Sequence, residues 1–151
     1  MISIRRVNPS EADVLTRIAL NAKRYWGYPE HWMDLWRQQL TFDARYFEIN
    51  ESWAAGVEGQ PVAFYTLLEK EDVAWLENLW VLPEYMGMGI GRTLFHHALE
   101  LARDRGYKKL RLEADPNAAG FYEKMGMHKI SERKYKMDDQ LRILPLMEIK
   151  L

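Results

Sequence analysis

The stretch Trp75–Thr93, WLENLWVLPEYMGMGIGRT, constrains the fold of this chain more than any other. An apolar segment typical of a strand leads through a Pro-Glu turn into a loop with glycine at Gly87, Gly89 and Gly91. An amphipathic segment follows directly. The first turn of a helix has N–H groups without intrahelical partners and carries the positive end of the helix dipole. The stretch therefore predicts a strand, a glycine loop and a helix start that together bind an anion.

Length and composition favour one ordinary globular domain. The 151 residues, 48% of them hydrophobic, suit a single domain over residues 1–151. A formal net charge of −1 gives no reason to expect nucleic acid or a membrane as a partner. The chain has no cysteine and its four histidines lack the spacing of metal ligands, so we expect no metal site. No apolar run near the N-terminus could form a signal peptide, which favours a cytoplasmic protein.

Periodicity predicts strands and helices along the whole chain. Strands are expected at 2–7, 52–57, 61–68, 73–82, 109–114, 128–136 and 144–150. Helices are expected from Ser10 to Gly27, at 29–40, at 90–105 and from Asp115 to Gly126, with Ser10 and Asp115 as N-terminal caps. Short links between residues 52 and 82 indicate an antiparallel meander. The segment 73–82 is apolar on both faces, which is typical of a central strand.

The glycine spacing fits neither of two common nucleotide-binding loops. A dinucleotide-binding loop follows G-x-G-x-x-G, whereas this chain reads G-x-G-x-G. A Walker loop requires G-x-x-x-x-G-K-S/T, and here Arg92 and Thr93 follow Gly91 without a lysine. A nucleotide-binding switch domain is therefore disfavoured. A tight turn would need only one glycine, so three at alternate positions favour a backbone cradle for another anion.

Two segments resemble motifs of the GNAT N-acetyltransferase superfamily, whose members use acetyl-CoA. EYMGMGIGR resembles the family loop Arg/Gln-x-x-Gly-x-Gly/Ala, which binds the pyrophosphate of the cofactor. The glycines match at Gly89 and Gly91, while Met86 stands at the usual Arg/Gln position. Arg92, in the first turn of the helix, can compensate by its charge.

The second resembling segment is ADPNAAGFYEKMGM, which is similar to a later motif of the family. Its matching positions are Asn117, Gly120, Tyr122 and Gly126. The DPNA segment and the ending Arg142–Pro145, an R-x-L-P sequence, also resemble an uncharacterised sub-group of GNAT proteins.

The resemblance implies a fold and a cofactor. The fold is α+β, with a mixed, mostly antiparallel sheet of about six to seven strands, about four flanking helices and strands that splay at the cofactor cleft. The cofactor is acetyl-CoA, with CoA as the product. The cofactor-binding residues that the resemblance indicates are Leu79, Val81, Gly87, Met88, Gly89, Ile90, Gly91, Arg92, Asn117 and Tyr122. Leu79 and Val81 would act through their backbone, beside the pantetheine arm.

Acyl transfer to an amine needs a base for the amine and an acid for the leaving thiolate. Glu77 is the candidate base, because strict alternation puts it on one face with Trp75, Leu79 and Val81. A carboxylate among apolar neighbours becomes a stronger base. A bulge that turns Glu77 to solvent or to an arginine is an equal alternative, and water could relay the proton. By the resemblance, Tyr122 is the candidate acid.

The acceptor site is expected under the first two helices and the aromatic segment between them. The resemblance points to Tyr25, Trp26 and Tyr28, with Trp32, and to Tyr65 and Trp75 from the sheet. Aromatic faces suit an amine cation or a flat apolar substrate, although each Trp could simply pack at a boundary. His96 and His97 are expected on the surface of their helix.

The function predicted from the sequence is transfer of an acetyl group from acetyl-CoA to a primary amine, by direct attack in a ternary complex. The acceptor would be a small-molecule or peptide amine. The alternative is a CoA-binding module with little or no catalysis. Family resemblance also allows a homodimer.

Overall fold

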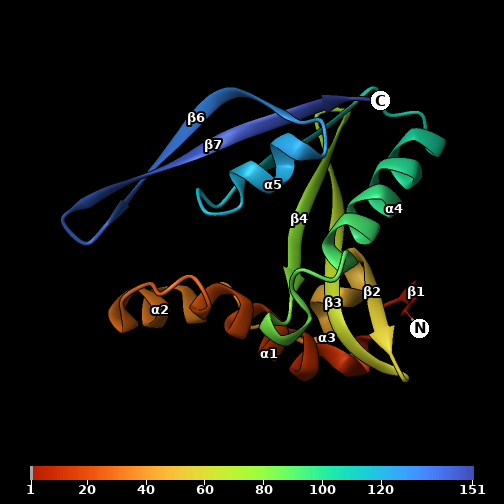
Figure 1. The fold of residues 1–151 in the computed structure, drawn as a ribbon, viewed down its shortest axis with the longest axis horizontal. Helices are drawn as coiled ribbons and strands as arrows, with labels where there is room; N and C mark the ends of the chain where they lie inside the picture. The colour runs from red at the N-terminus through yellow and green to blue at the C-terminus, as the bar shows by residue number, and fades with distance from the viewer. Residues whose placement is uncertain (1) are drawn as a thin grey trace. The chain divides into compact units, whose positions relative to one another are not determined.

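A computed structural model describes residues 2–151 of the chain (Figure 1). Over these residues seven strands form one mixed sheet in the order β1-β2-β3-β4-β5-β7-β6, and five α-helices accompany it. The strands are β1 (Ile2–Arg6), β2 (Glu51–Val57), β3 (Gln60–Lys70), β4 (Val73–Val81), β5 (Lys109–Glu113), β6 (His128–Met137) and β7 (Gln140–Lys150). The helices are α1 (Ala12–Arg24), α2 (Glu30–Arg37), α3 (Ala44–Ile49), α4 (Ile90–Asp104) and α5 (Ala119–Lys124). The predicted fold class is confirmed.

Two helices begin where the sequence prediction did not place them. Asn8, not Ser10, caps the first helical segment: its Oδ1 accepts from the Ser10 N–H at 3.0 Å, and a 3₁₀ turn at Pro9–Glu11 precedes α1. Asp115 does not cap α5 directly. Its Oδ1 accepts from the Asn117 N–H at 2.9 Å and closes a turn, so that α5 starts only at Ala119.

Two further elements differ from the prediction. Helix α3 was not predicted, because its six residues are too few to show a period. Asp43 is nevertheless a residue type preferred at helix N-caps, and in the structure its Oδ1 accepts from the Tyr46 N–H at 2.9 Å. Strand β7 begins at Gln140 instead of residue 144, because it pairs with β6 from Gln140 opposite Met137 onward.

The chain forms two compact units, which we call unit 1 (Met1–Leu68 and Glu77–Ala98) and unit 2 (Glu69–Leu76 and Leu99–Leu151). Strands β3 and β4 and helix α4 each contribute to both units. The single domain expected over 1–151 stays a prediction. The candidate site residues are divided between the two units.

In unit 1, β1 pairs antiparallel with β2, and β2 forms a hairpin with β3 (Figure 1). Glu58 and Gly59 make the hairpin turn with φ of 52° and 81°, as a primed turn requires. Strand β3 divides two packing surfaces. The Phe64 ring packs against Phe42 and against Phe47 of α3, whereas the next residue, Tyr65, faces α4.

In unit 2, the start of β4 pairs parallel with β5, with Ala74 opposite Leu110 and Trp75 opposite Arg111. Strand β5 pairs antiparallel with β7, and β7 with β6. Glu148 of β7 is buried and its Oε2 accepts from the Arg111 guanidinium at 2.7 Å. Burial alone would raise the pKa of Glu148, but Arg111 and neighbouring positive charges lower it below the ordinary value.

Candidate functional site

The glycine loop of unit 1 lies between β4 and α4, in the order that the sequence predicts. After a 3₁₀ turn at Pro83–Tyr85, Gly87 and Gly89 adopt left-handed φ of 79° and 82°. Such angles strain any residue with a Cβ, so these two positions require glycine. A Cβ added at either glycine would meet nothing within 4 Å, so the space around both is open.

Helix α4 begins immediately after this loop. The Gly89 carbonyl accepts from the Thr93 N–H at 3.0 Å and from the Thr93 hydroxyl at 2.9 Å, which fixes the first turn. Gly91 lies within that turn, and Arg92 beside it is exposed. Met88 is exposed, whereas Ile90 is buried in the core and can offer a ligand only its backbone. An exposed helix start with backbone of this kind is a candidate anion site.

Strand β4 contains a backbone irregularity that the sequence did not reveal. Asn78 has a φ of 58°, which interrupts the alternation of side chains after Glu77. The Asn78 Nδ2 donates to the Tyr46 hydroxyl at 2.8 Å and to the Thr66 Oγ1 at 3.3 Å. Thr66 is buried and bonds the Ser52 hydroxyl at 2.7 Å. Asn78 is thus held by a buried polar network.

The irregularity changes the expected place of Glu77. Burial raises the pKa of Tyr46, and the charge of half-buried Glu77 raises it further. Asn78 contacts Tyr46 of α3 and Glu77 is within electrostatic reach of the same residue, although strict alternation would put Glu77 and Asn78 on opposite faces. The premise of strict alternation is wrong here. The sequence did not indicate the roles of the polar residues Tyr46 and Asn78. The one available signal for Asn78 is that asparagine adopts left-handed backbone more readily than most other residues.

In unit 2, Tyr122 of α5 is buried, with 8% of its surface exposed. Burial raises the pKa of its hydroxyl, and the negative charge of Asp115 raises it further. The group therefore keeps its proton at neutral pH and can act as a hydrogen-bond donor. Asn117 is exposed, and its Nδ2 donates to the Asp115 Oδ1 at 3.0 Å.

The other carboxylate oxygen of Asp115 pairs with Arg142. The Arg142 Nη2 lies 3.1 Å from the Asp115 Oδ2, and the two side chains are only 9% and 10% exposed. The DPNA and R-x-L-P segments are thus bonded to each other. The structure brings Asp115, Asn117 and Arg142 together and places the charge of Asp115 within electrostatic reach of Tyr122.

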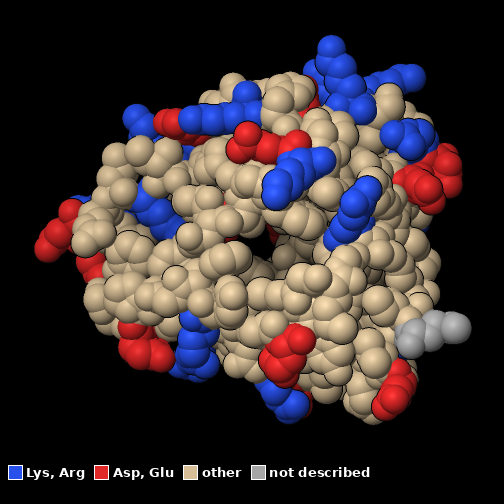
Figure 2. Space-filling view, in the orientation of Figure 1, with Lys and Arg blue, Asp and Glu red and all other residues tan. Residues whose placement is uncertain are grey.

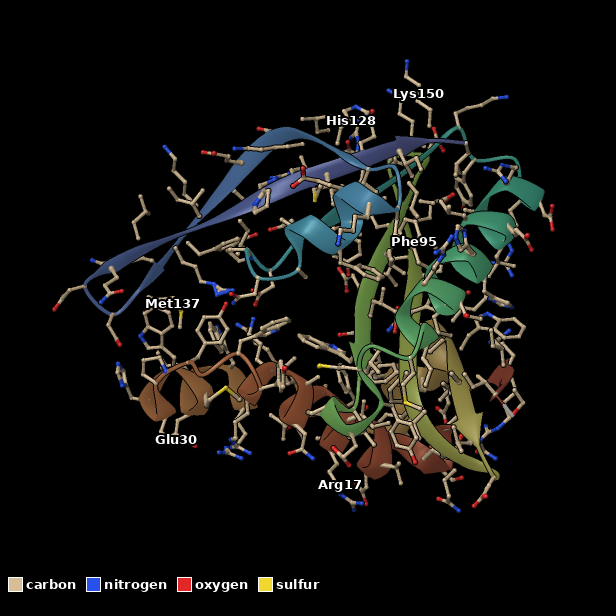
Figure 3. All side chains as sticks on the ribbon, viewed as in Figure 1. Arg17, Glu30, Phe95, His128, Met137 and Lys150 are labelled. Atoms are coloured by element: carbon tan, nitrogen blue, oxygen red, sulfur yellow. The ribbon has the colours of Figure 1, made fainter. Side chains whose placement is uncertain are left out.

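The aromatic residues predicted for the acceptor site make different sets of contacts. Tyr28 lies in a ring cluster of unit 1 with Trp32 and Trp36 of α2, the helix that begins at Glu30 in Figure 3. Tyr25 and Trp26 are exposed by 57% and 37% and pack edge to face against each other at 5.3 Å. Trp75 belongs to unit 2, where the Lys70 ammonium lies 5.1 Å from its ring.

Tyr65 does not join this group. It is completely buried, and its hydroxyl bonds the His97 Nδ1 of α4 at 2.6 Å. Alternation along β3 is the reason, because Phe64 and Thr66 take the face toward α3. His97 is half-buried, with its ring 4.6 Å from that of Trp53, so the predicted surface position of His97 is wrong. His96 is exposed.

Other features of the described chain are plain. Among residues 2–151, no group of three or more His, Cys, Asp or Glu is arranged to hold a metal ion. Within the same residues, none of the helices has the length and apolar character to cross a membrane. Basic and acidic side chains are interspersed over the face in Figure 2.

Comparison with known proteins identifies a family. Residues 15–127 match the acetyltransferase (GNAT) family. A provisionally named [ribosomal protein bS18]-alanine N-acetyltransferase of Bacillus subtilis is 32% identical over 110 residues, which are 62% of this chain and 68% of that protein. Against several further curated relatives, the chain spans less than two thirds of the relative's length.

Solved structures share the fold over the whole chain. A GCN5-related N-acetyltransferase from Rhodopseudomonas palustris superposes with a TM-score of 0.83 at 25% identity, covering 99% of this chain and 95% of that one. The PaiA N-acetyltransferase from Thermoplasma acidophilum, solved in complex with coenzyme A, has a TM-score of 0.80 at 20% identity. That match covers 100% of this chain and 99% of the other.

Proposed function

The chain belongs to the acetyltransferase (GNAT) family, and from this premise we propose that it transfers an acetyl group from acetyl-CoA to a primary amine. The observation that carries the proposal is the glycine loop. Gly87 and Gly89 hold left-handed backbone in open space directly before α4. A pyrophosphate fits this place, because it can accept from backbone N–H groups and meets the positive end of the helix dipole.

We infer that the glycine loop and β4 bind different parts of acetyl-CoA. The backbone of Gly87–Arg92 would hold the phosphates, with the exposed Arg92 adding positive charge. The backbone of Leu79 and Val81 would pair with the pantetheine arm. In unit 2, Asn117 stays a cofactor-binding residue that the resemblance predicts. Bound acetyl-CoA supplies a thioester carbonyl that an amine can attack.

The chain's own groups would then move the protons. Glu77, half-buried and within electrostatic reach of Tyr46, is the proposed base that takes a proton from the amine, directly or through water. Tyr122 is the proposed donor to the leaving sulfur. Its raised pKa keeps the hydroxyl protonated until a negative charge forms next to it. The sub-group indicated by the DPNA and R-x-L-P segments, the cytoplasmic location and a homodimer stay predictions.

The test combines binding with turnover. CoA should raise the melting temperature, and acetyl-CoA with a panel of primary amines should release free thiol. Gly89→Glu should lose both effects, because it adds bulk and negative charge where the anion binds. Glu84→Gln, an exposed residue before the loop, is the matched control and should keep both. Stabilisation by ATP or NAD but not by CoA would refute the proposal. Stabilisation by CoA without turnover on any amine would indicate a binding module.

A further inference from the structure

The ammonium of Lys23, near the end of α1, is surrounded by aromatic rings of unit 1. The Lys23 Nζ lies 4.2 Å from the ring centroid of Trp36, 5.1 Å from that of Tyr28 and 5.9 Å from that of Trp80. All three distances fall inside the ~6 Å range of cation–π attraction. We call Tyr28, Trp36 and Trp80 the aromatic cage. By contrast, Lys70 lies over the ring of Trp75 in unit 2 at 5.1 Å.

The rings of the cage are held by contacts other than those with Lys23. Tyr28 meets Trp36 edge to face at 4.9 Å, and Trp32 packs on Trp36 at 5.8 Å. The Trp80 indole N–H donates to the Asn78 Oδ1 at 3.2 Å, which ties this ring to the irregular position of β4. Because these contacts hold the rings, the cage should keep its shape when its occupant changes.

We propose that the aromatic cage binds a cationic group of the amine acceptor, and that Lys23 fills the cage in the ligand-free chain. The inference rests on the proposed acetyl transfer, because Trp80 stands between Leu79 and Val81, whose backbone is assigned to the acyl donor. A cation in the cage would therefore lie on the same strand as the reacting end. Two of the cage residues, Trp36 and Trp80, were not among the acceptor residues predicted from the sequence.

The chemistry of a cage narrows the class of acceptor. Aromatic faces stabilise an ammonium and thereby oppose the loss of its proton, whereas the nitrogen that attacks a thioester must be neutral. The nitrogen in the cage is therefore not the nitrogen that is acetylated. An acceptor with two basic nitrogens satisfies both demands, with one ammonium in the cage and one free amine at the thioester. The proposed acceptor is therefore a compound with two basic nitrogens, of which an alkyl diamine is the simplest.

Lys23 acts in this scheme as a tethered competitor. A tethered group has an effective concentration in the millimolar range, so it lowers the apparent affinity of any free cation for the same rings. Lys23→Met removes the charge but keeps an unbranched apolar stem. The variant should therefore bind a free cation more tightly than the wild type does.

The binding test uses two probes of nearly the same shape, the cation choline and the neutral 3,3-dimethylbutan-1-ol. Both are titrated without acetyl-CoA, and the indole N–H signals of the six tryptophans are followed by NMR. Choline should bind, and Lys23→Met should bind it roughly fivefold more tightly. Tyr28→Leu in the Lys23→Met background should lose this gain. Lys70→Met, the control for a lysine over the Trp75 ring outside the cage, should match the wild type. Equal binding of both probes, or unchanged affinity in Lys23→Met, overturns the proposal.

The turnover test compares 1,4-diaminobutane with butylamine as acceptors in the presence of acetyl-CoA. The diamine should have a KM at least about fivefold lower than the monoamine, and Tyr28→Leu should remove most of that difference. Equal KM values in the wild type overturn the diamine assignment and leave acetyl transfer standing. Choline binding without turnover of any amine refutes acetyl transfer and leaves the cation site standing.

Discussion

The ion pair between Asp115 and Arg142 allows a sharp prediction about stability. Both side chains are about nine-tenths buried, and the two charges meet at 3.1 Å. Removing one partner of a buried pair leaves the other charge without compensation, at a cost of about 3–5 kcal/mol. Asp115 keeps two hydrogen bonds from Asn117 when Arg142 is removed, so the lower end of that range applies. We expect Arg142→Met to lose about 3 kcal/mol of unfolding free energy.

A double-mutant cycle separates this charge effect from packing. The double variant Asp115→Asn, Arg142→Met has no charge left at this buried pair. Its loss of unfolding free energy should be about 2 kcal/mol smaller than the sum of the losses in the two single variants. Unfolding is measured in urea by tryptophan fluorescence and circular dichroism, and coincident transitions establish that one free energy describes the chain. Single losses that simply add in the double variant would refute the reasoning.

Three other predictions concern single residues. Tyr122→Phe should lower kcat by about tenfold or more with little change in CoA affinity, because it removes a proton donor and keeps the ring; wild-type kcat would exclude Tyr122 as the acid. Glu77→Gln should lower kcat/KM by about a hundredfold, and an unchanged kcat/KM would exclude Glu77 as the base. Glu148 has a depressed pKa in the folded chain, so its stabilising effect is present at neutral pH and is lost as pH falls below about 4. Unfolding free energies measured from pH 7 to pH 3 should therefore converge for wild type and Glu148→Gln, and a constant gap would contradict the pairing with Arg111.

The sequence predicts the parts of the fold that local rules decide. The order of strand, glycine loop and helix start around Gly87 and Gly89 follows from the local sequence, and the antiparallel pairing of β2 with β3 follows from the short link between them. The central position of β4 follows from its two apolar faces, and the observed strand order places β4 in the middle of the sheet. Each of these predictions depends on residues that are close together in the chain.

The sequence failed where contacts between distant segments decide. The left-handed backbone of Asn78 is held by Tyr46 and Thr66, which no pattern along β4 can show. The burial of Tyr65 against His97 depends on which face of β3 meets α4. Alternation gives two faces to a strand but does not say which helix covers each one. The same ambiguity hid Trp80 as a member of the aromatic cage.

Glycine is required at Gly87 and Gly89 for the left-handed backbone more than for its small size. Gly87 and Gly89 have left-handed backbone, yet a methyl group on either would meet nothing within 4 Å. A D-amino acid prefers the mirror image of the angles that an L-amino acid adopts, so D-alanine suits both positions. Semisynthetic protein with D-alanine at these two positions should fold at least as stably as the natural chain, since D-alanine also restricts the unfolded state. In such a protein the methyl groups would occupy only the open space, so a loss of CoA binding with full stability would report where the ligand touches the loop.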